Sequence, residues 1–276
     1  MAKGDLLIIG GKEDKTGDRQ ILRTFAELCL KRQGPVGILT TATNYPQETW
    51  DEYSRLFKEL GAEEAVRLDI ASRDRADDEG TAGLLRELGG VFITGGDQLR
   101  LTSILGGTAI YEALHREWQG GMPIGGTSAG AAIMSRLMII SATKEDDGEL
   151  TVELGTGFGF LEDVLIDQHF SQRARMHRLM NAIAYNPQVV GIGIDENTAI
   201  LVQDEGRYFD VIGEHTVSVF DGRKLSYVDV AVPHESAEIT VSGITLHLLA
   251  NGYRFDLKSR ELIMNRGRDQ DGHPEG

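Results

Sequence analysis

The chain has 276 residues, of which 41% are hydrophobic and 7% aromatic, an ordinary composition for a globular protein with a sizeable core. Its 28 lysines and arginines stand against 43 aspartates and glutamates, and the formal net charge of -15 disfavours nucleic acid and anionic membranes as partners. The single cysteine, Cys29, excludes an intramolecular disulfide and a cysteine-rich metal site.

The first half of the chain alternates short apolar runs with helical patterns. Apolar runs that predict strands lie at 6–9, 36–39, 65–68, 91–94 and 122–124. Helical patterns between them lie near 19–32, 46–60, 78–88 and 110–118. Repeated strand–helix units are typical of a parallel sheet, so the sequence predicts an α/β fold with its site at the carboxyl ends of the strands.

After Ile200 the pattern changes to alternating strands, which predicts a mixed or antiparallel, β-rich C-terminal flank packed on the same core. The expected strands lie at 199–202, 208–212, 216–220, 237–241 and 243–249. Because no linker separates this flank, we expect a single domain over residues 1–264. The tail at 265–276 lacks apolar residues, and we expect it to be disordered.

The segment Gly126-Thr-Ser-Ala-Gly130 follows the predicted strand at 122–124 and precedes a helix-forming run of small residues. A serine on such a turn lies above the strand ends, and the flanking glycines relieve crowding around it. This is how a nucleophile is displayed, although so short a pattern also occurs in plain glycine-rich connections. Ser128 is therefore the candidate nucleophile.

A serine nucleophile needs a base and an orienting acid, and both are available at the ends of predicted strands. His169 follows the apolar run at 164–168, and Glu196 follows the run at 191–195. Several aspartates compete for the role of the acid, and we rank Glu196 first and Asp146 second. The other candidates near the serine and histidine in sequence are Asp147, Asp163 and Asp167.

Two glycine turns, Gly10-Gly11 and Gly95-Gly96, also end predicted strands. Neither has the spacing of a dinucleotide or phosphate-binding fingerprint, so tight strand-to-helix turns are their simplest use. At Gly96 a close backbone approach would supply an oxyanion N–H beside that of Ala129.

Three arginines follow His169 closely: Arg173, Arg175 and Arg178. At roughly 100° per residue, Arg175 and Arg178 project within about 60° of each other on a helix. Solvated charges paired with carboxylates would explain at least one of the three. Their place beside His169 favours an anionic substrate group, and they would repel a metal cation from His169 and His177.

Four segments together resemble the cyanophycinase family, and the likeness spans most of residues 4–255. These segments are Gly125–Ala132, Thr94–Gln98, Asp167–Phe170 with the arginines after it, and Gly193–Ala199. The Gly-Thr-Ser-Ala-Gly portion is shared with the related dipeptidase peptidase E. Asp-Gln-His-Phe followed by spaced arginines is more specifically similar to cyanophycinase.

The resemblance implies a serine exopeptidase that hydrolyses the aspartate backbone of cyanophycin, multi-L-arginyl-poly-L-aspartate, and releases β-Asp-Arg dipeptides. On this view Ser128 attacks, His169 transfers the proton and Glu196 orients His169. The chain order Ser, His, Glu differs from that of the α/β-hydrolases. It implies instead a three-layer, mostly parallel sheet of the flavodoxin-like or class I glutamine-amidotransferase-like kind.

The resemblance also implies a homodimer, no metal and no organic cofactor, and a set of substrate-binding residues. These are Gln98, Asp167, Gln168, Arg173, Arg175 and Arg178. Acids and amides suit the guanidinium of the polymer, and arginines suit its free carboxylate. Two alternatives remain open, a peptidase E-like α-aspartyl dipeptidase and a noncatalytic α/β ligand-binding protein.

The N-terminal residues lead directly into the first predicted strand, and no apolar run approaches membrane-spanning length. We therefore expect a cytoplasmic protein without a membrane partner.

Overall fold

A computed structural model of the chain describes residues 2–62, 64–144, 150–229 and 239–264. Three sequence-based expectations fall wholly or partly outside the described residues. They are the tail at 265–276, the alternative acids Asp146 and Asp147, and the first two residues of the strand expected at 237–241.

The larger of the two main sheets has nine strands in the order β17-β16-β11-β10-β1-β5-β4-β2-β3. Strands β1 to β5 run parallel, and the strands from β10 outward pair antiparallel. The predicted parallel sheet with a β-rich flank is therefore confirmed. The strands are β1 (Leu6–Ile9), β2 (Val36–Leu39), β3 (Ala65–Leu68), β4 (Gly90–Ile93), β5 (Ile124–Thr127), β10 (Thr198–Gln203), β11 (Tyr208–Gly213), β16 (Arg254–Asp256) and β17 (Glu261–Ile263).

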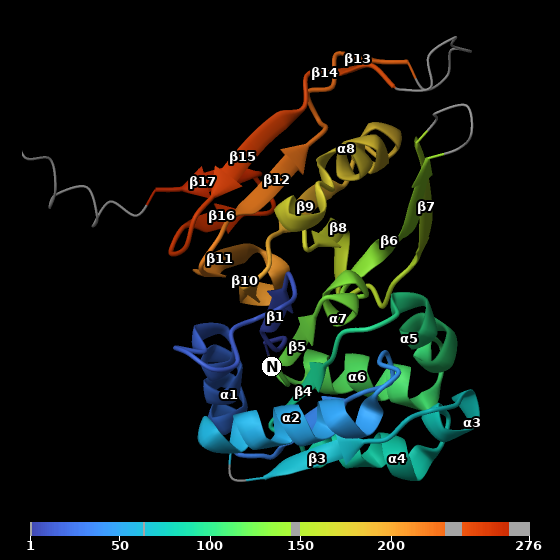
Figure 1. The fold of residues 1–276 in the computed structure, drawn as a ribbon, viewed down its shortest axis with the longest axis vertical. Coiled ribbons are helices and arrows are strands. Elements are labelled where there is room, and N and C mark those ends of the chain that lie inside the picture. The colour runs from blue at the N-terminus through green and yellow to red at the C-terminus, as the bar shows by residue number, and fades with distance from the viewer. Residues whose placement is uncertain (1, 63, 145–149, 230–238, 265–276) are drawn as a thin grey trace, which may run out of the picture.

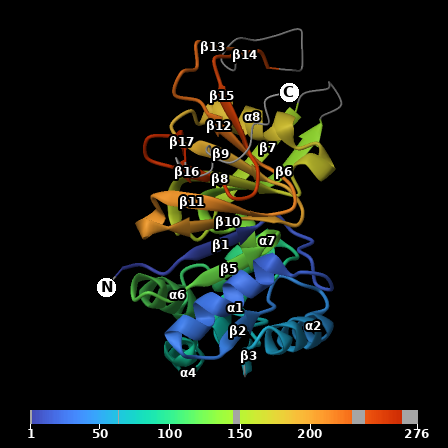
Figure 2. The same cartoon turned by 90° about the vertical axis from the view of Figure 1, so that its left-hand side faces the viewer.

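Helices cover both faces of the parallel half, which makes the three layers visible in Figures 1 and 2. Along β1, Leu7 and Ile9 pack in the core cluster of α1 and α2, while Leu6 and Ile8 pack in the cluster that includes α5 and α6. This alternation follows from the two-residue period of a strand. The helices are α1 (Gln20–Arg32), α2 (Pro46–Glu59), α3 (Arg73–Ala76), α4 (Glu79–Gly83), α5 (Gln98–Leu105) and α6 (Ala109–Gln119), with a 3-10 turn η1 (Leu84–Glu87) after α4.

β5 begins later than predicted and includes two glycines that read as a turn in the sequence. A Cβ on Gly125 would lie 2.9 Å from the Phe25 ring, and a Cβ on Gly126 would lie 2.3 Å from the carbonyl oxygen of Gly130. Close packing on both faces of the strand therefore requires residues without side chains at these two positions.

A second sheet of six strands, in the order β15-β12-β9-β8-β6-β7, lies beside the antiparallel half of the first sheet. Its strands are β6 (Ser135–Lys144), β7 (Leu150–Thr156), β8 (Leu161–Gln168), β9 (Val190–Ile194), β12 (Val217–Asp221) and β15 (Thr245–Leu249). The remaining elements are α7 (Ala129–Ala132), η2 (Ser171–Arg173), α8 (Met176–Tyr185), η3 (Asp204–Gly206) and the small pair β13 (Tyr227–Val228) and β14 (Val241–Ser242). The predicted flank is thus divided between two sheets.

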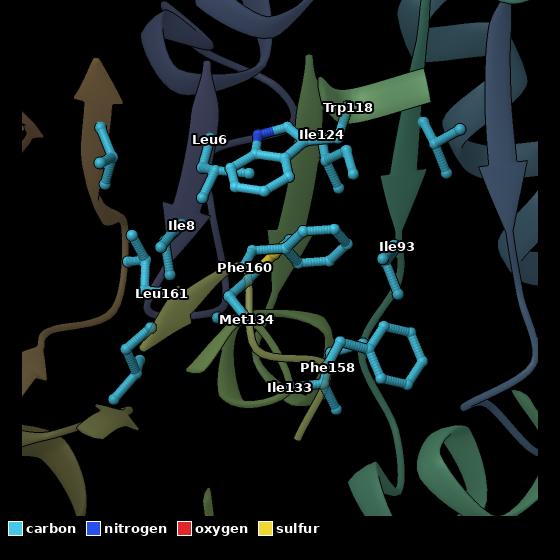
Figure 3. Packing of buried hydrophobic residues seen from close by; sticks show 14 of the residues in the cluster. Leu6, Ile8, Ile93, Trp118, Ile124, Ile133, Met134, Phe158, Phe160 and Leu161 are labelled. Atoms are coloured by element: carbon cyan, nitrogen blue, oxygen red, sulfur yellow. The ribbon is translucent and has the colours of Figure 1, made fainter. Parts of the chain in front are cut away.

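One hydrophobic cluster includes residues of both main sheets. In β8, Val164 and Ile166 belong to this shared cluster, whereas Leu165 packs with residues of α8. Figure 3 shows part of the cluster, in which the ring of Phe160, just before β8, packs against Trp118 of α6 with 5.2 Å between the ring centroids. We propose on this basis that residues 1–264 form one domain.

Strand register brings the carboxyl ends of four strands together. Ile9 at the end of β1 pairs with Thr127 of β5 and with Ala199 of β10. In the second sheet Gln168 at the end of β8 pairs with Ile194 at the end of β9. The short corner 195–197 then carries the chain from β9 in one sheet to β10 in the other. Residues that follow these strands therefore meet between the two sheets.

Candidate active site

Ser128 adopts a strained backbone conformation at the end of β5. Its φ of 52° and ψ of -108° lie outside the regions that side-chain-bearing residues ordinarily occupy. Its N–H donates to the Ile9 carbonyl at 3.0 Å, and its carbonyl accepts from the N–H groups of Ala131 and Ala132. The expected helix lasts only one turn, α7, and β6 begins soon afterwards at Ser135. The predicted strand–turn–helix display of the serine is present.

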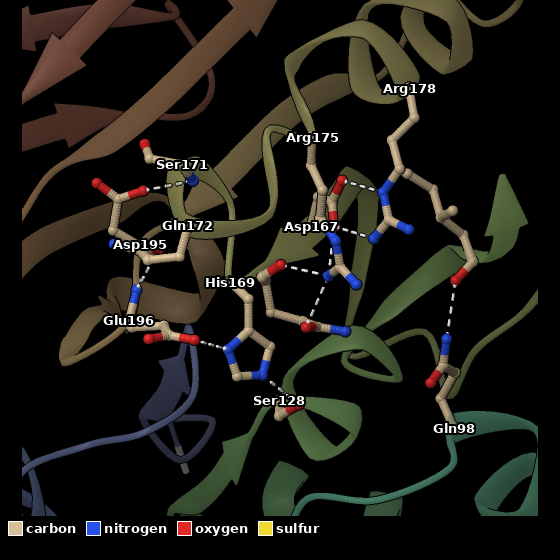
Figure 4. A network of polar contacts seen from close by, with 12 residues as sticks. Gln98, Ser128, Asp167, His169, Ser171, Gln172, Arg175, Arg178, Asp195 and Glu196 are labelled. Atoms are coloured by element: carbon tan, nitrogen blue, oxygen red, sulfur yellow. Dashed lines mark hydrogen bonds and ion pairs between the residues drawn. The ribbon is translucent and has the colours of Figure 1, made fainter. Parts of the chain in front are cut away.

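Ser128, His169 and Glu196 form a continuous chain of hydrogen bonds (Figure 4). Ser128 Oγ lies 2.9 Å from His169 Nε2, and His169 Nδ1 lies 2.8 Å from Glu196 Oε1. An ionised carboxylate only accepts hydrogen bonds, so we assign the ring proton to Nδ1. His169 Nε2 can then accept the hydroxyl proton of Ser128.

The glycine turn after β1 holds His169 in place. The N–H of His169 donates to the Gly10 carbonyl at 2.8 Å. Gly11 has a φ of 102°, and a Cβ there would lie 2.3 Å from Cε1 of the His169 ring. Any side chain would displace the imidazole, so this turn, which sequence analysis treated as a simple connection, belongs to the site.

Glu196 and not its neighbour Asp195 faces the histidine. The buried carboxylate of Asp195 accepts from the N–H of Ser171 at 2.9 Å and from the hydroxyl of Thr216 at 2.8 Å, which ties the loop after β8 to β12. The side chains of these two successive residues point in different directions. No local pattern in the sequence distinguishes the one that faces the histidine from the other.

Two further side chains, neither of them predicted from the sequence, contact Glu196. Lys12 Nζ lies 3.1 Å from Glu196 Oε1, and the Gln172 amide oxygen accepts from the Glu196 N–H at 3.0 Å. Lys12 directly follows the Gly10-Gly11 turn, and a search for positive charges beside that turn would have found it.

The surroundings keep the histidine neutral and the glutamate ionised. Burial lowers the pKa of His169 below its usual value, the hydrogen bond to Glu196 opposes this, and the charges of Arg173 and Arg175 lower it further. Burial by itself raises the pKa of Glu196, but hydrogen bonds from Lys12 and His169 outweigh burial, and its pKa is lowered. These are the protonation states that a base and its orienting acid require.

The backbone of the turn after β4 passes close to the nucleophile. A Cβ on Gly95 would lie 3.3 Å from Ser128 Cβ. Gly96 has a φ of 144°, and a Cβ there would lie 2.1 Å from the Ala42 carbonyl oxygen, so only glycine fits. Among the described residues, neither the N–H of Gly96 nor that of Ala129 has a hydrogen-bond acceptor.

Asp167 draws two of the three arginines together. It is 1% exposed, and Arg178 binds it with two nitrogens, the Nε–Oδ2 distance being 2.7 Å. Arg175 Nη1 lies 3.3 Å from Asp167 Oδ1 and also donates to the backbone and side-chain oxygens of Gln168. Burial lowers the pKa of Arg175 to about 10, against the opposing charge of Asp167. Arg175 and Arg178 are thus paired with a carboxylate of the protein, which is one of the two uses expected for these arginines from the sequence.

The remaining predicted binding residues lie around this cluster. Arg173, on η2, is exposed, and its guanidinium has no partner within the part of the chain that the structure describes. The amide nitrogen of Gln98, at the start of α5, donates to the carbonyls of Ile139 and Ile140 on β6. Within the described ranges, no group of three or more His, Cys, Asp or Glu side chains is arranged to hold a metal ion.

The model of peptidase family S51 matches residues 6–208. The chain belongs to this family. It is therefore a serine-type peptidase, and curated relatives cover nearly all of it. It is 37% identical over 265 residues to "Cyanophycinase" from Trichormus variabilis, which covers 95% of this chain and 88% of the relative. The corresponding protein of Synechococcus elongatus is 36% identical and covers 94% of this chain and 81% of the relative.

Two solved structures resemble this S51 peptidase in fold. A peptidase from an acI-B1 actinobacterium has a TM-score of 0.68 and 19% identity, covering 92% of this chain and 97% of its own. A putative peptidase E protein from Listeria monocytogenes has a TM-score of 0.52 and 21% identity, covering 77% of this chain and 98% of its own. None of the helices in the described part of this S51 peptidase has the length and apolarity that crossing a bilayer requires.

Proposed function

We propose that this S51 peptidase hydrolyses the aspartate backbone of cyanophycin and releases β-Asp-Arg dipeptides from an end of the polymer. The observation that carries the proposal is the Ser128–His169–Glu196 hydrogen-bond chain, with distances of 2.9 and 2.8 Å, in a chain whose curated relatives are named cyanophycinase.

The catalytic roles follow from this geometry. Ser128 Oγ attacks the scissile backbone carbonyl while His169 Nε2 takes its proton, and Glu196 stabilises the imidazolium that forms. The N–H groups of Gly96 and Ala129 bind the oxyanion. His169 then protonates the leaving amine, and a water activated by the same histidine hydrolyses the acyl-enzyme to restore Ser128.

The charged groups beside the triad suit a substrate that repeats both carboxylates and guanidinium groups. Arg175 and Arg178 share one carboxylate, Asp167, and the charge of Arg173 also acts on Arg175, so this group has a net positive charge and attracts free carboxylates. Arg173 is the arginine whose guanidinium the described protein groups leave unpaired. Gln98 and Gln168 add amide groups that bind polar atoms of the polymer.

The assembly and location expected from the sequence remain part of the proposal. We propose a cytoplasmic homodimer, to be checked by light scattering of the purified protein and by cell fractionation. The buried free thiol of Cys29 is compatible with a reducing compartment.

Dipeptide release from purified cyanophycin tests the function directly. Wild type, Ser128→Ala and the control Ser103→Ala, which alters an exposed serine of α5, are compared by chromatography and mass spectrometry. We expect β-Asp-Arg from wild type and the control, and none from Ser128→Ala. A folded wild type that cleaves α-aspartyl dipeptides and leaves cyanophycin intact would replace the proposal with a peptidase E-like activity.

A further inference from the structure

A buried carboxylate outside the hydrogen-bond chain contacts the residue that precedes the nucleophile. Glu13 is 4% exposed, and its Oε2 accepts from the hydroxyl of Thr127 at 2.6 Å. Its other oxygen accepts from the hydroxyl of Tyr53 on α2. A glutamate is seldom buried this completely unless its oxygens are bonded, and here both are.

The backbone next to this contact is the strained turn at Ser128. Such a conformation persists only where the surroundings hold the chain on both sides. The N–H of Ser128 is held by the Ile9 carbonyl, and the side chain of Thr127 is held by Glu13. Both anchors come from β1 and the loop after it.

The same loop also contacts the other two members of the hydrogen-bond chain. The Gly10 carbonyl accepts from the His169 N–H, and Lys12 Nζ lies 3.1 Å from Glu196. Residues 10–13 therefore contact a nucleophile turn in one sheet and a histidine and glutamate that follow strands of the other sheet. No other segment of the described chain bonds with all three parts.

We propose that Glu13 is a positioning residue, which fixes the Ser128 turn through Thr127 and so sets the contact between Ser128 Oγ and His169 Nε2. The proposal rests on the proposed peptidase function. A hydrogen bond to an ionised carboxylate is short and strong, which suits an anchor for a strained turn. Tyr53 remains a donor to Glu13, because burial and the Glu13 charge raise the pKa of Tyr53 well above its usual value.

Two substitutions of Thr127 separate the hydroxyl from the shape of the side chain. Thr127→Val keeps the shape and removes the donor, and we expect kcat to fall at least about tenfold with KM within about twofold. Thr127→Ser keeps the donor and should recover most of the kcat that valine loses. Thr108→Val is the matched control. It removes a buried threonine hydroxyl that donates to the Leu105 carbonyl at 2.6 Å, and this contact lies between α5 and α6, outside the site.

A double-mutant cycle tests whether Glu13 acts through Thr127. We expect Glu13→Gln to lower kcat about threefold or more, because an amide offers one acceptor oxygen where the carboxylate offers two. Added to Thr127→Val, it should cause little further loss, since the contact is already gone. If Thr127→Val is not recovered folded, Glu13→Gln carries the test. Fully additive losses would overturn the proposal.

Labelling of Ser128 by a small organophosphorus reagent provides a readout that does not need the polymer. We expect Ser128 to be labelled more slowly in Thr127→Val than in wild type. The melting temperatures of Thr127→Val and Thr108→Val should be equal, so that the difference in labelling does not come from stability. Equal labelling rates, or the same kcat loss in Thr108→Val, would overturn the positioning role. A wild type that labels but releases no dipeptides would refute the proposed substrate alone, and the labelling rates would still decide the role of Glu13.

Discussion

Replacing Glu196 by glutamine removes a charge while leaving a hydrogen-bond acceptor in place. His169 and Lys12 both lie within hydrogen-bonding distance of the same oxygen, Oε1. A glutamine carbonyl can take over that position, and Lys12 disfavours the flipped amide, whose N–H groups would face its ammonium. His169 Nδ1 therefore keeps its proton, and the tautomer that activates Ser128 is retained.

The expected fall in kcat of Glu196→Gln then comes only from the loss of the negative charge. A hydrogen bond to a charged group contributes about 1 to 2 kcal/mol more than a neutral one, which corresponds to a fall in kcat of about 5- to 30-fold. A flipped amide would impose the wrong tautomer, for which about 10⁴-fold is the expected scale. The size of the loss thus reports which atom of the amide faces His169.

Initial rates of dipeptide release over a range of pH provide the assay. Because Glu196 raises the pKa of His169, its loss should also move the acid limb of kcat/KM to lower pH. The control is Glu214→Gln, an exposed carboxylate bonded to Asn197, which should leave kcat within about twofold. A kcat for Glu196→Gln close to wild type, or an acid limb displaced upward, would refute the assigned role.

Three further outcomes follow from the environment of His169. Because the pKa of His169 is lowered, the acid limb of the wild-type kcat/KM profile should have its midpoint below pH 6.5. Arg173→Gln removes a positive charge that lowers the pKa of His169, so it should move this midpoint upward. A pH–rate profile of each protein measures both. Gly11→Ala, whose Cβ would meet the imidazole, should lower kcat about 100-fold or more. Gly107→Ala, at a φ of 69° with nothing within 4 Å, should instead cost only about 1 kcal/mol of stability, so equal kcat values for the two variants would contradict this account.

The parallel half of the fold was predictable because its signal is local. Each short apolar run between amphipathic segments became a strand, and β1, β2 and β3 have the predicted bounds. The second sheet was not predictable in the same way. β10 and β12 are similar apolar segments in sequence, yet they lie in different sheets, because membership of a sheet depends on distant pairing partners.

Among the site residues, Ser128 and His169 were identifiable from strand ends and a short motif, and the structure brings them into contact. The ion pairs of Asp167 were not, because Arg175 precedes the first turn of α8 and helical projection does not apply to it. Glu13 was missed since its partner at the nucleophile turn, Thr127, lies more than 100 residues away, and no local pattern marks such a contact. Lys12 was missed because the Gly10-Gly11 turn beside it was not treated as part of the site.

The division of the site between two sheets has a consequence for how the protein acquires activity during synthesis. Ser128 emerges from the ribosome well before His169 and Glu196, and β10 must pair with β1 across a separation of about 190 residues before the corner at 195–197 reaches Gly11. Contacts so distant in sequence form late in folding. Ser128 is therefore inactive in the nascent chain. Peptidase activity begins only after the pairing of β10 with β1 has brought His169 and Glu196 to the serine.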